Sequence, residues 1–140
     1  MIRTKALVCS KLSEDMSCVQ LEILELEGPE ENEVLIKVKA ASVNFPDLLM
    51  TKGMYQHRPK LPFVLGMEGS GVIDKIGSKV KKVKEGDEVT FGAMGKGAFS
   101  EYVVLGENSV ALKPTTLNFS EAASFQTAYL TAYVSLVRRG

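Results

Sequence analysis

The sequence has very few of the residues that build metal sites and disulfide frameworks. It contains one histidine, His57, and two cysteines, Cys9 and Cys18. A catalytic zinc needs three protein ligands drawn from cysteine, histidine and carboxylates, and the two cysteines lack the spacing of a metal-binding motif. A cysteine-rich zinc lobe is therefore excluded. We expect the cysteines to be reduced, partly buried thiols and His57 to be an exposed loop residue.

Excess charge and long apolar segments are also missing. Lysine plus arginine and aspartate plus glutamate balance at 17 each, so no net charge favours nucleic acid or an anionic membrane as a partner. No apolar run approaches the ~20 residues that span a bilayer. The first residues lead into a strand pattern and do not resemble a signal peptide. We therefore expect a cytoplasmic protein that binds neither nucleic acid nor membranes.

What remains is the composition of an ordinary folded domain. Of the 140 residues, 45% are hydrophobic and 24% are charged, which is typical of a globular protein and not of a disordered one. A chain of this length can bury a core without disulfides or metal ions to stabilise it. One domain is expected.

Most of the first 112 residues have strand patterns. In the stretch 33–40, Val34, Ile36 and Val38 alternate with polar residues, and this period of two is typical of a half-buried strand. Shorter apolar runs separated by turn residues predict further strands at residues 6–9, 21–26, 71–76, 88–91 and 102–105. Many short strands at this spacing indicate a mainly β fold, either an antiparallel sandwich or a barrel.

Two helices are expected in addition. Pro46 suits a first helical turn and Gly53 suits a helix exit, which predicts a short helix near residues 46–52. A second, long helix is predicted near residues 120–138, with Ser120 as its N-cap. This helix carries almost no charge over most of its length, and helices that are apolar all round are normally buried. The rest of the chain offers little to bury it.

Four sequence motifs together resemble a known family. They are VNFPDL at residues 43–48, GMY at 53–55, PFVLGMEGSG at 62–71 and LTAY at 130–133. They are similar to the N-terminal domain of medium-chain dehydrogenases/reductases, specifically the zinc-free quinone oxidoreductase branch. The resemblance implies that residues 1–140 form a GroES-like β-barrel or sandwich that holds the substrate pocket. It also implies that the family's Rossmann cofactor domain is absent from this chain.

The resemblance has a direct consequence for metal binding. Zinc-dependent members of the family have a cysteine at the position of Asn44 and a histidine at the position of Met67. Neither an amide nor a thioether is a usual zinc ligand. The resemblance therefore implies an enzyme without zinc.

Without a metal ion, hydrogen-bond donors have to polarise the substrate carbonyl. The side-chain amide of Asn44 and the hydroxyl of Tyr55 can both donate to a developing oxyanion, and a tyrosine can also act as a general acid. We predict these two as the catalytic residues. The structural alternatives are that Asn44 satisfies backbone groups near a helix start and that the Tyr55 ring packs on Phe63.

The resemblance also implies a set of residues beside the nicotinamide of NADPH or NADH, which the absent domain would bind for the most part. These cofactor-binding residues are Asn44, Phe45 and Thr131. Thr131 belongs to a stripe of hydroxyl residues at helical spacing, namely Ser124, Thr127, Thr131 and Ser135. Such hydroxyls can instead bond back to carbonyls of their own helix. Glu68 is expected to be a buried carboxylate held by a basic partner or by backbone donors.

The function implied by the resemblance is reduction of a quinone or an activated alkene by hydride transfer from NAD(P)H without zinc. The expected partners are a small quinone or enone substrate and further copies of the same chain in a homo-oligomer. Two alternatives remain open. One is an enoyl-thioester reductase domain, and the other is a free-standing GroES-like binding or scaffold module without catalysis.

The replacement of both metal-ligand positions generates a first prediction. Protein purified without an affinity tag should contain less than about one-tenth of an equivalent of zinc by elemental analysis. Stoichiometric zinc that a chelator removes would contradict it.

Overall fold

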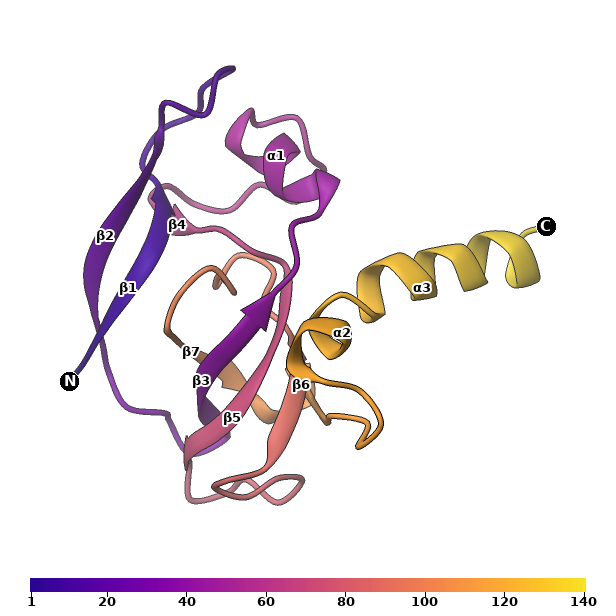
Figure 1. The fold of residues 1–140 in the computed structure, drawn as a ribbon. Coiled ribbons are helices and arrows are strands. Elements are labelled where there is room, and N and C mark those ends of the chain that lie inside the picture. Colours follow the sequence, from indigo (N-terminus) through magenta and orange to yellow (C-terminus); the bar gives the residue numbers. More distant parts are fainter.

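A computed structural model describes all 140 residues and consists of two antiparallel sheets with helices at one end (Figure 1). The strands are β1 (Ile2–Cys9), β2 (Val19–Leu26), β3 (Glu33–Ala41), β4 (Phe63–Val64), β5 (Glu68–Ile76), β6 (Glu88–Gly92), β7 (Tyr102–Gly106) and β8 (Val110–Leu112). The helices are α1 (Phe45–Thr51), α2 (Phe119–Ala123) and α3 (Gln126–Tyr133), with the short helical turns η1 (Glu107–Ser109) and η2 (Val134–Arg138).

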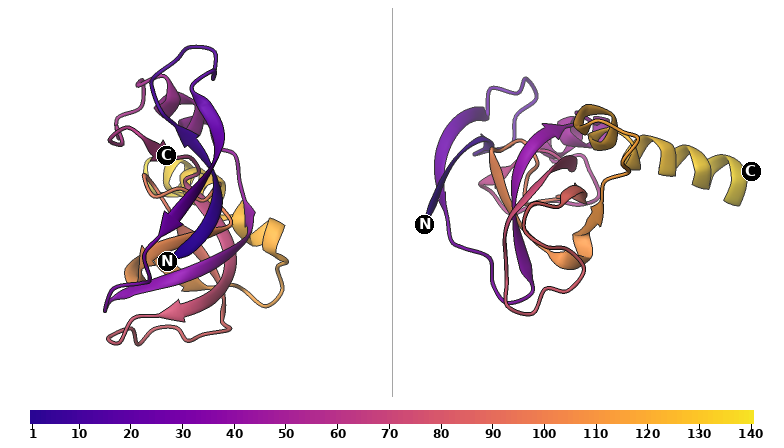
Figure 2. Two further views of the ribbon diagram at one scale, coloured as in Figure 1. Left: turned by 90° about the vertical axis from the view of Figure 1, so that its left-hand side faces the viewer. Right: turned by 60° about the horizontal axis from the view of Figure 1, so that its bottom comes forward.

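The sheets have three and five strands. The smaller has the order β2-β1-β4 and the larger the order β7-β3-β5-β6-β8. A bridge between Ala6 and Ser100 joins them, next to a hydrogen bond of 2.9 Å from the Leu7 N–H to the Phe99 carbonyl. The two views in Figure 2 show the sheets curving around a common interior. The predicted mainly β fold with antiparallel strands is confirmed.

The strand patterns explain how the core is arranged. Val34 and Ile36 of β3 are completely buried in the main core cluster, as their alternation predicts. Leu35, on the opposite face of β3, is also completely buried, so both faces of this central strand are covered there. The main cluster has ten buried residues: Val34, Ile36, Ile73, Val83, Val89, Phe91, Ala93, Ala98, Val103 and Leu105.

A second, smaller core lies beside α1. Its six buried members are Cys9, Cys18, Met50, Phe63, Leu65 and Met67. The side chains of Tyr55 and Phe99 pack against this second cluster. It therefore connects the first hairpin, α1 and the start of β5.

Two glycines of the GMEGSG motif are required by the backbone. Gly66 has φ +100°, a conformation that side chains rarely adopt, and a Cβ there would lie 2.7 Å from the Phe99 backbone nitrogen. At Gly71 a Cβ would lie 2.3 Å from the Lys37 carbonyl oxygen. These glycines let β5 pass close to its neighbours, so their role is structural.

Two strands were not predicted from the sequence. β4 has two residues, and β8 has three, two of which are exposed. Segments this short do not complete a recognisable alternation. They form because neighbouring strands offer free edges, β1 to β4 and β6 to β8.

The short helix agrees with its prediction. Pro46 lies in the first turn of α1, and Gly53 follows the helix with φ +68°. The N–H of Gly53 donates to the Met50 carbonyl, and the N–H of Met54 reaches back to the Leu49 carbonyl at 2.9 Å. This is the usual way in which a glycine ends a helix.

The prediction of one continuous helix over residues 120–138 is wrong in two respects. The N-cap is Asn118, not Ser120: the Asn118 side chain accepts the Glu121 N–H, and the Glu121 carboxylate accepts the Asn118 N–H, each at 2.9 Å. The helix is also interrupted after α2. The Ser124 hydroxyl donates to the carbonyls of Ser120 and Glu121, and this competition with the backbone favours a helix end there.

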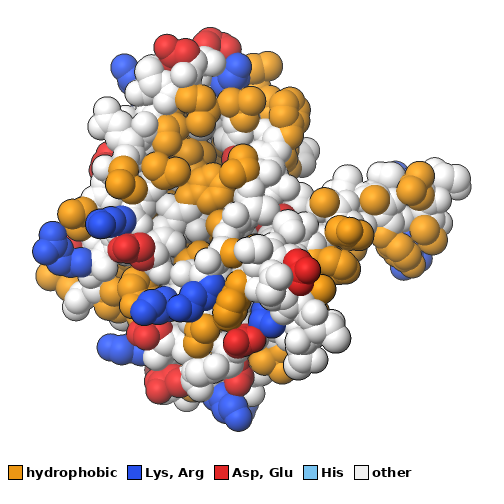
Figure 3. All heavy atoms as spheres, viewed as in Figure 1, with side chains coloured by type: hydrophobic (Ala, Val, Ile, Leu, Met, Phe, Trp, Pro, Cys, Tyr) orange, Lys and Arg blue, Asp and Glu red, His pale blue; other side chains and the backbone are white.

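As expected from how little the rest of the chain offers to bury this apolar segment, α3 and η2 project away from the sheets (Figures 1 and 2). Figure 3 shows hydrophobic side chains along this projection. The large apolar residues exposed there are Phe125, Tyr129, Leu130, Tyr133, Val134, Leu136 and Val137. No helix has the length and apolar character that crossing a bilayer requires.

This exposure predicts self-association. Apolar patches larger than a few hundred Å² are uncommon on monomers, and a single barrel face cannot cover a helix that is apolar on several sides. At micromolar concentration, light scattering should report a dimer or a larger species. Leu136→Glu should dissociate it, because Leu136 is 78% exposed on the projection.

A matched control is Gln20→Glu, which adds the same charge to an exposed position on β2 and should leave the association unchanged. A monodisperse wild-type monomer whose α3 amides are protected from hydrogen exchange would contradict this prediction.

Candidate functional site

The buried carboxylate of Glu68 joins the polar residues at one end of the larger sheet. Glu68 begins β5 and is only 3% exposed. Its Oε1 accepts hydrogen bonds from the Ser42 hydroxyl at 2.6 Å and from the Asn44 side-chain amide at 3.1 Å. Its Oε2 accepts the backbone N–H of Thr127 at 2.9 Å. One side chain thus connects the end of β3, the start of α1 and the start of α3.

The strand register brings these groups together. β3 and β5 are antiparallel, with Ala41 opposite Gly69, so Ser42 leaves β3 beside Glu68. Two residues later, Asn44 is the N-cap of α1. Its backbone N–H donates to Asp47 Oδ2 at 2.8 Å. The sequence expectation for Glu68 is confirmed in its burial and its backbone donor, but no basic partner is present.

The amide of Asn44 is used within the protein. Its Nδ2 donates to the Ser42 hydroxyl at 2.9 Å as well as to Glu68, which uses both of its hydrogens. The carbonyl oxygen Oδ1 faces the backbone N–H of Asp47 in the arrangement of a capping box, but the Asp47 N–H donates to the Asn44 backbone carbonyl at 3.0 Å and makes no full hydrogen bond to Oδ1. In this arrangement Asn44 can offer a ligand an acceptor, whereas the sequence analysis predicted a donor.

Asp47 is a second buried carboxylate, on α1 and 3% exposed. Its Oδ1 has no hydrogen-bond partner. Burial raises the pKa of Asp47, and the charge of Glu68 raises it further, while the backbone N–H groups of Asn44, Gly66 and Met67 oppose the shift. The chain contains no cluster of three or more histidine, cysteine, aspartate or glutamate side chains that could hold a metal ion.

Met67 and Tyr55 meet at the second cluster. Met67 is a buried member of that cluster, and the half-buried ring of Tyr55 packs against it. Phe63 belongs to the same cluster, as the structural alternative for Tyr55 anticipated. The Tyr55 hydroxyl makes no hydrogen bond within the chain. Phe45 is 70% exposed at the start of α1.

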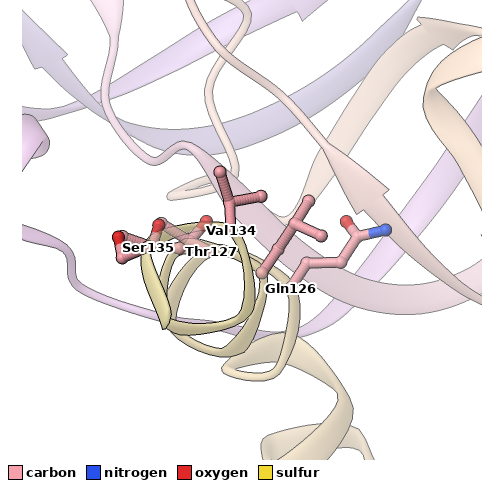
Figure 4. A pocket seen from close by; sticks show the side chains of 6 residues that line it. Gln126, Thr127, Val134 and Ser135 are labelled. Atoms are coloured by element: carbon pink, nitrogen blue, oxygen red, sulfur yellow. The ribbon is translucent and has the colours of Figure 1, made fainter. Parts of the chain in front are cut away.

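A shallow pocket runs along α3 and η2 (Figure 4). Its volume is about 510 Å³, and it is lined by Gln126, Thr127, Leu130, Thr131, Val134 and Ser135. The hydroxyls of Thr127, Thr131 and Ser135 make no hydrogen bond within the chain, whereas that of Ser124 bonds back to its own helix. Three members of the predicted stripe therefore keep free hydroxyls in one pocket.

Thr127 also borders a second cavity, of about 390 Å³, that reaches Met67 and Glu68. The structure thus brings Asn44 and Thr127 together through Glu68, and it places Thr131 one helical turn farther along α3. Tyr55 packs against the second cluster, to which Met67 belongs. The sequence analysis missed Ser42, because only the β3–β5 register indicates that it faces Glu68.

Residues 30–115 match the alcohol dehydrogenase GroES-like domain family. A quinone oxidoreductase of Lama guanicoe is 34% identical over 122 residues, which cover 83% of this chain and 37% of the relative. A 2-methylene-furan-3-one reductase of Solanum lycopersicum is 38% identical over 135 residues, which cover 86% of this chain and 35% of the relative.

Solved structures agree with the sequence relatives. The Escherichia coli quinone oxidoreductase complexed with NADPH superimposes with a TM-score of 0.86 and 29% identity, covering 96% of this chain and 41% of that chain. The chain thus spans about two fifths of the length of the relatives it matches. Its two antiparallel sheets, its helices and its family match lead to one conclusion: the chain belongs to the family of alcohol dehydrogenase GroES-like domains, among relatives named quinone oxidoreductases.

Proposed function

We propose that this chain is the substrate-pocket domain of an NAD(P)H-dependent reductase that transfers hydride to a quinone or an activated alkene without zinc. The observation that carries the proposal is the Glu68-centred cluster, which holds Asn44 and the start of α3 together beside two cavities. The names of the relatives support an oxidoreductase.

The residues present fit the nicotinamide end of such a cofactor. A carboxamide offers both donors and an acceptor, and the chain offers the Oδ1 of Asn44 and the unpaired hydroxyls of Thr127 and Thr131. The exposed ring of Phe45 adds an apolar surface. When bound, the reduced cofactor supplies the hydride. We propose Asn44, Phe45 and Thr131 as its contacts in this domain, with Thr127 beside them.

Glu68 has a positioning role in this proposal. By accepting both the Ser42 hydroxyl and one Asn44 N–H, it sets the direction of the Asn44 carbonyl oxygen. By accepting the Thr127 N–H, it places the hydroxyls of α3 relative to Asn44. Hydrogen-bonding groups that are held before the substrate arrives need no reorganisation during the reaction.

Tyr55 is the proposed proton donor. Its hydroxyl has no partner within the chain, and its ring is held by the second cluster, so the phenol is free to donate to a substrate. Reduction of an activated alkene requires a proton on carbon, whereas a reduced quinone carries an oxygen anion that water can protonate. The tomato relative is named as a reductase of a methylene-furanone, and this favours an activated alkene as the second candidate substrate.

The three hydrogen bonds that the Glu68 carboxylate accepts generate a prediction about stability. Glu68→Gln replaces one carboxylate oxygen with an NH₂ group, which cannot accept from Thr127 or from Ser42 and Asn44. Leaving a buried polar group without its partner costs about 1–3 kcal/mol of unfolding free energy, measurable by urea denaturation. Amides at the start of α3 should exchange faster with deuterium.

The matched control is Glu101→Gln. The Glu101 carboxylate accepts one backbone N–H, from Lys5, at an exposed site, so its replacement should change the unfolding free energy by less than about 0.5 kcal/mol. Equal effects of the two substitutions would contradict the role assigned to Glu68.

Catalysis can be tested in a chimera. Residues 1–140 are joined to the remaining portion of the Escherichia coli relative, and NADPH oxidation is followed with a benzoquinone and with an enoyl thioester. We expect turnover of at least one. Tyr55→Phe should lower kcat on an enoyl thioester by about 10²-fold but by only a few-fold on the quinone, as expected for loss of a general acid.

Tyr102→Phe, on β7, serves as the control for removal of a tyrosine hydroxyl. A chimera that melts cooperatively and binds NADPH but reduces neither substrate would refute the proposed function. Equal small effects of Tyr55→Phe on both substrates would leave Tyr55 as a packing residue.

A further inference from the structure

The two cysteines of the chain lie in contact with one another. Cys9 and Cys18 are both free thiols and are 0% and 1% exposed. Their sulfur atoms are 3.6 Å apart, and the Cys9 thiol also points to the carbonyl of Lys11 at 3.2 Å. Neither thiol takes part in the site around Glu68. Both lie in the second cluster, which that site shares through Met67.

The first hairpin explains this proximity. Cys9 ends β1 and is paired with Val19, the first residue of β2, so Cys18 stands beside it where the strands separate. The Ser10 N–H donates to the Cys18 carbonyl at 3.1 Å and holds the two backbones together. Both side chains turn inward to the same cluster. A disulfide requires side chains that face each other across a short backbone separation, and the 3.6 Å contact between the two sulfur atoms shows that these side chains face each other.

We propose that Cys9 and Cys18 are a reversible oxidation site that closes to a disulfide in the presence of a small disulfide such as oxidised glutathione. One thiolate attacks a sulfur of the oxidant, which forms a mixed disulfide and releases one reduced glutathione. The second thiolate then attacks the protein sulfur of that mixed disulfide and releases the other. In sum, two protein thiols become one disulfide, and the oxidant is reduced to two thiols.

The loop between the cysteines controls access to them. Residues 11–17 are mostly exposed. Two hydrogen bonds attach this loop to α1: the Ser13 N–H donates to the Thr51 carbonyl, and the Thr51 hydroxyl donates to the Met16 sulfur. Burial and the neighbouring Cys18 raise the pKa of Cys9 to about 11, which disfavours the reactive thiolate. Oxidation therefore proceeds when the loop opens locally.

Closure of the disulfide has two physical consequences. The sulfur–sulfur separation falls from 3.6 Å to about 2.05 Å, which shifts the packing of the second cluster next to Met67 and Tyr55. The covalent link also closes the loop that joins β1 to β2 and reduces its freedom to open. Oxidation thus links the end of β1 covalently to the start of β2, and reduction releases the link. This inference is independent of the proposed function.

The test uses the 140-residue chain and oxidised glutathione, in native buffer and in mild urea below the unfolding transition. Glutathione disulfide is preferable to peroxide, because exposed Met16 and Met54 would be oxidised by peroxide. Intact mass should fall by two hydrogens without a glutathione adduct, and reductant should restore it. Cys18→Ala and Cys9→Ala should each gain one glutathione instead.

Amides of residues 11–17 should exchange more slowly in the oxidised protein, and its melting temperature should rise by a few degrees (~2–8 °C). Three outcomes would overturn the proposal: two free thiols after treatment in mild urea, glutathione adducts on the wild-type protein that do not resolve, or oxidation no faster than global unfolding. The intact mass of the wild-type protein tests whether the disulfide forms even if a variant fails to fold.

Discussion

The burial of one carboxylate constrains the whole of the site. An ionised side chain removed from water is stable only if donors replace its hydration, and Glu68 obtains three of them from segments far apart in the sequence. Ser42 and Asn44 follow β3, whereas Thr127 lies in the first turn of α3. The positions of α1 and α3 relative to the sheet are therefore coupled, because both supply donors to the same group. The glycines around Glu68 serve the same arrangement by letting β5 run close to its neighbours.

The parts of the fold that depend on local sequence patterns could be predicted. The alternation in β3 and the proline and glycine that bound α1 report on single segments, and the structure agrees with them. Prediction failed for the helix ends in residues 118–124, where neighbouring side chains compete to hydrogen-bond the same backbone groups. Asn118, not Ser120, caps α2, because Asn118 lies three residues before the reciprocating carboxylate of Glu121. The break at Ser124 depends on a hydroxyl that bonds to two carbonyls.

The site itself was predictable only in part. The motif that contains Asn44 indicated the right region, but the use of both amide hydrogens by Ser42 and Glu68 follows from strand register and not from residue type. The exposure of the long apolar segment after residue 124 could be expected only from how little the rest of the chain offers to cover it, because periodicity reports how apolar a helix is and not what lies beside it. Exposed apolar residues on α3 belong to a surface for which the first 120 residues provide no cover.

The position of β3 has a consequence for the order in which the domain forms during synthesis. β3 pairs on one side with β5 and on the other with β7, where Glu33 lies opposite Gly106. Sixty residues separate the end of β3 from the start of β7, and the ribosome must release them before β3 can acquire its second neighbour. The β1–β2 hairpin is local and can form early, but the larger sheet has to wait for distant partners, and such contacts slow folding. Thr127 emerges later still, so its bond to Glu68 can form only after every strand of the larger sheet has been synthesised.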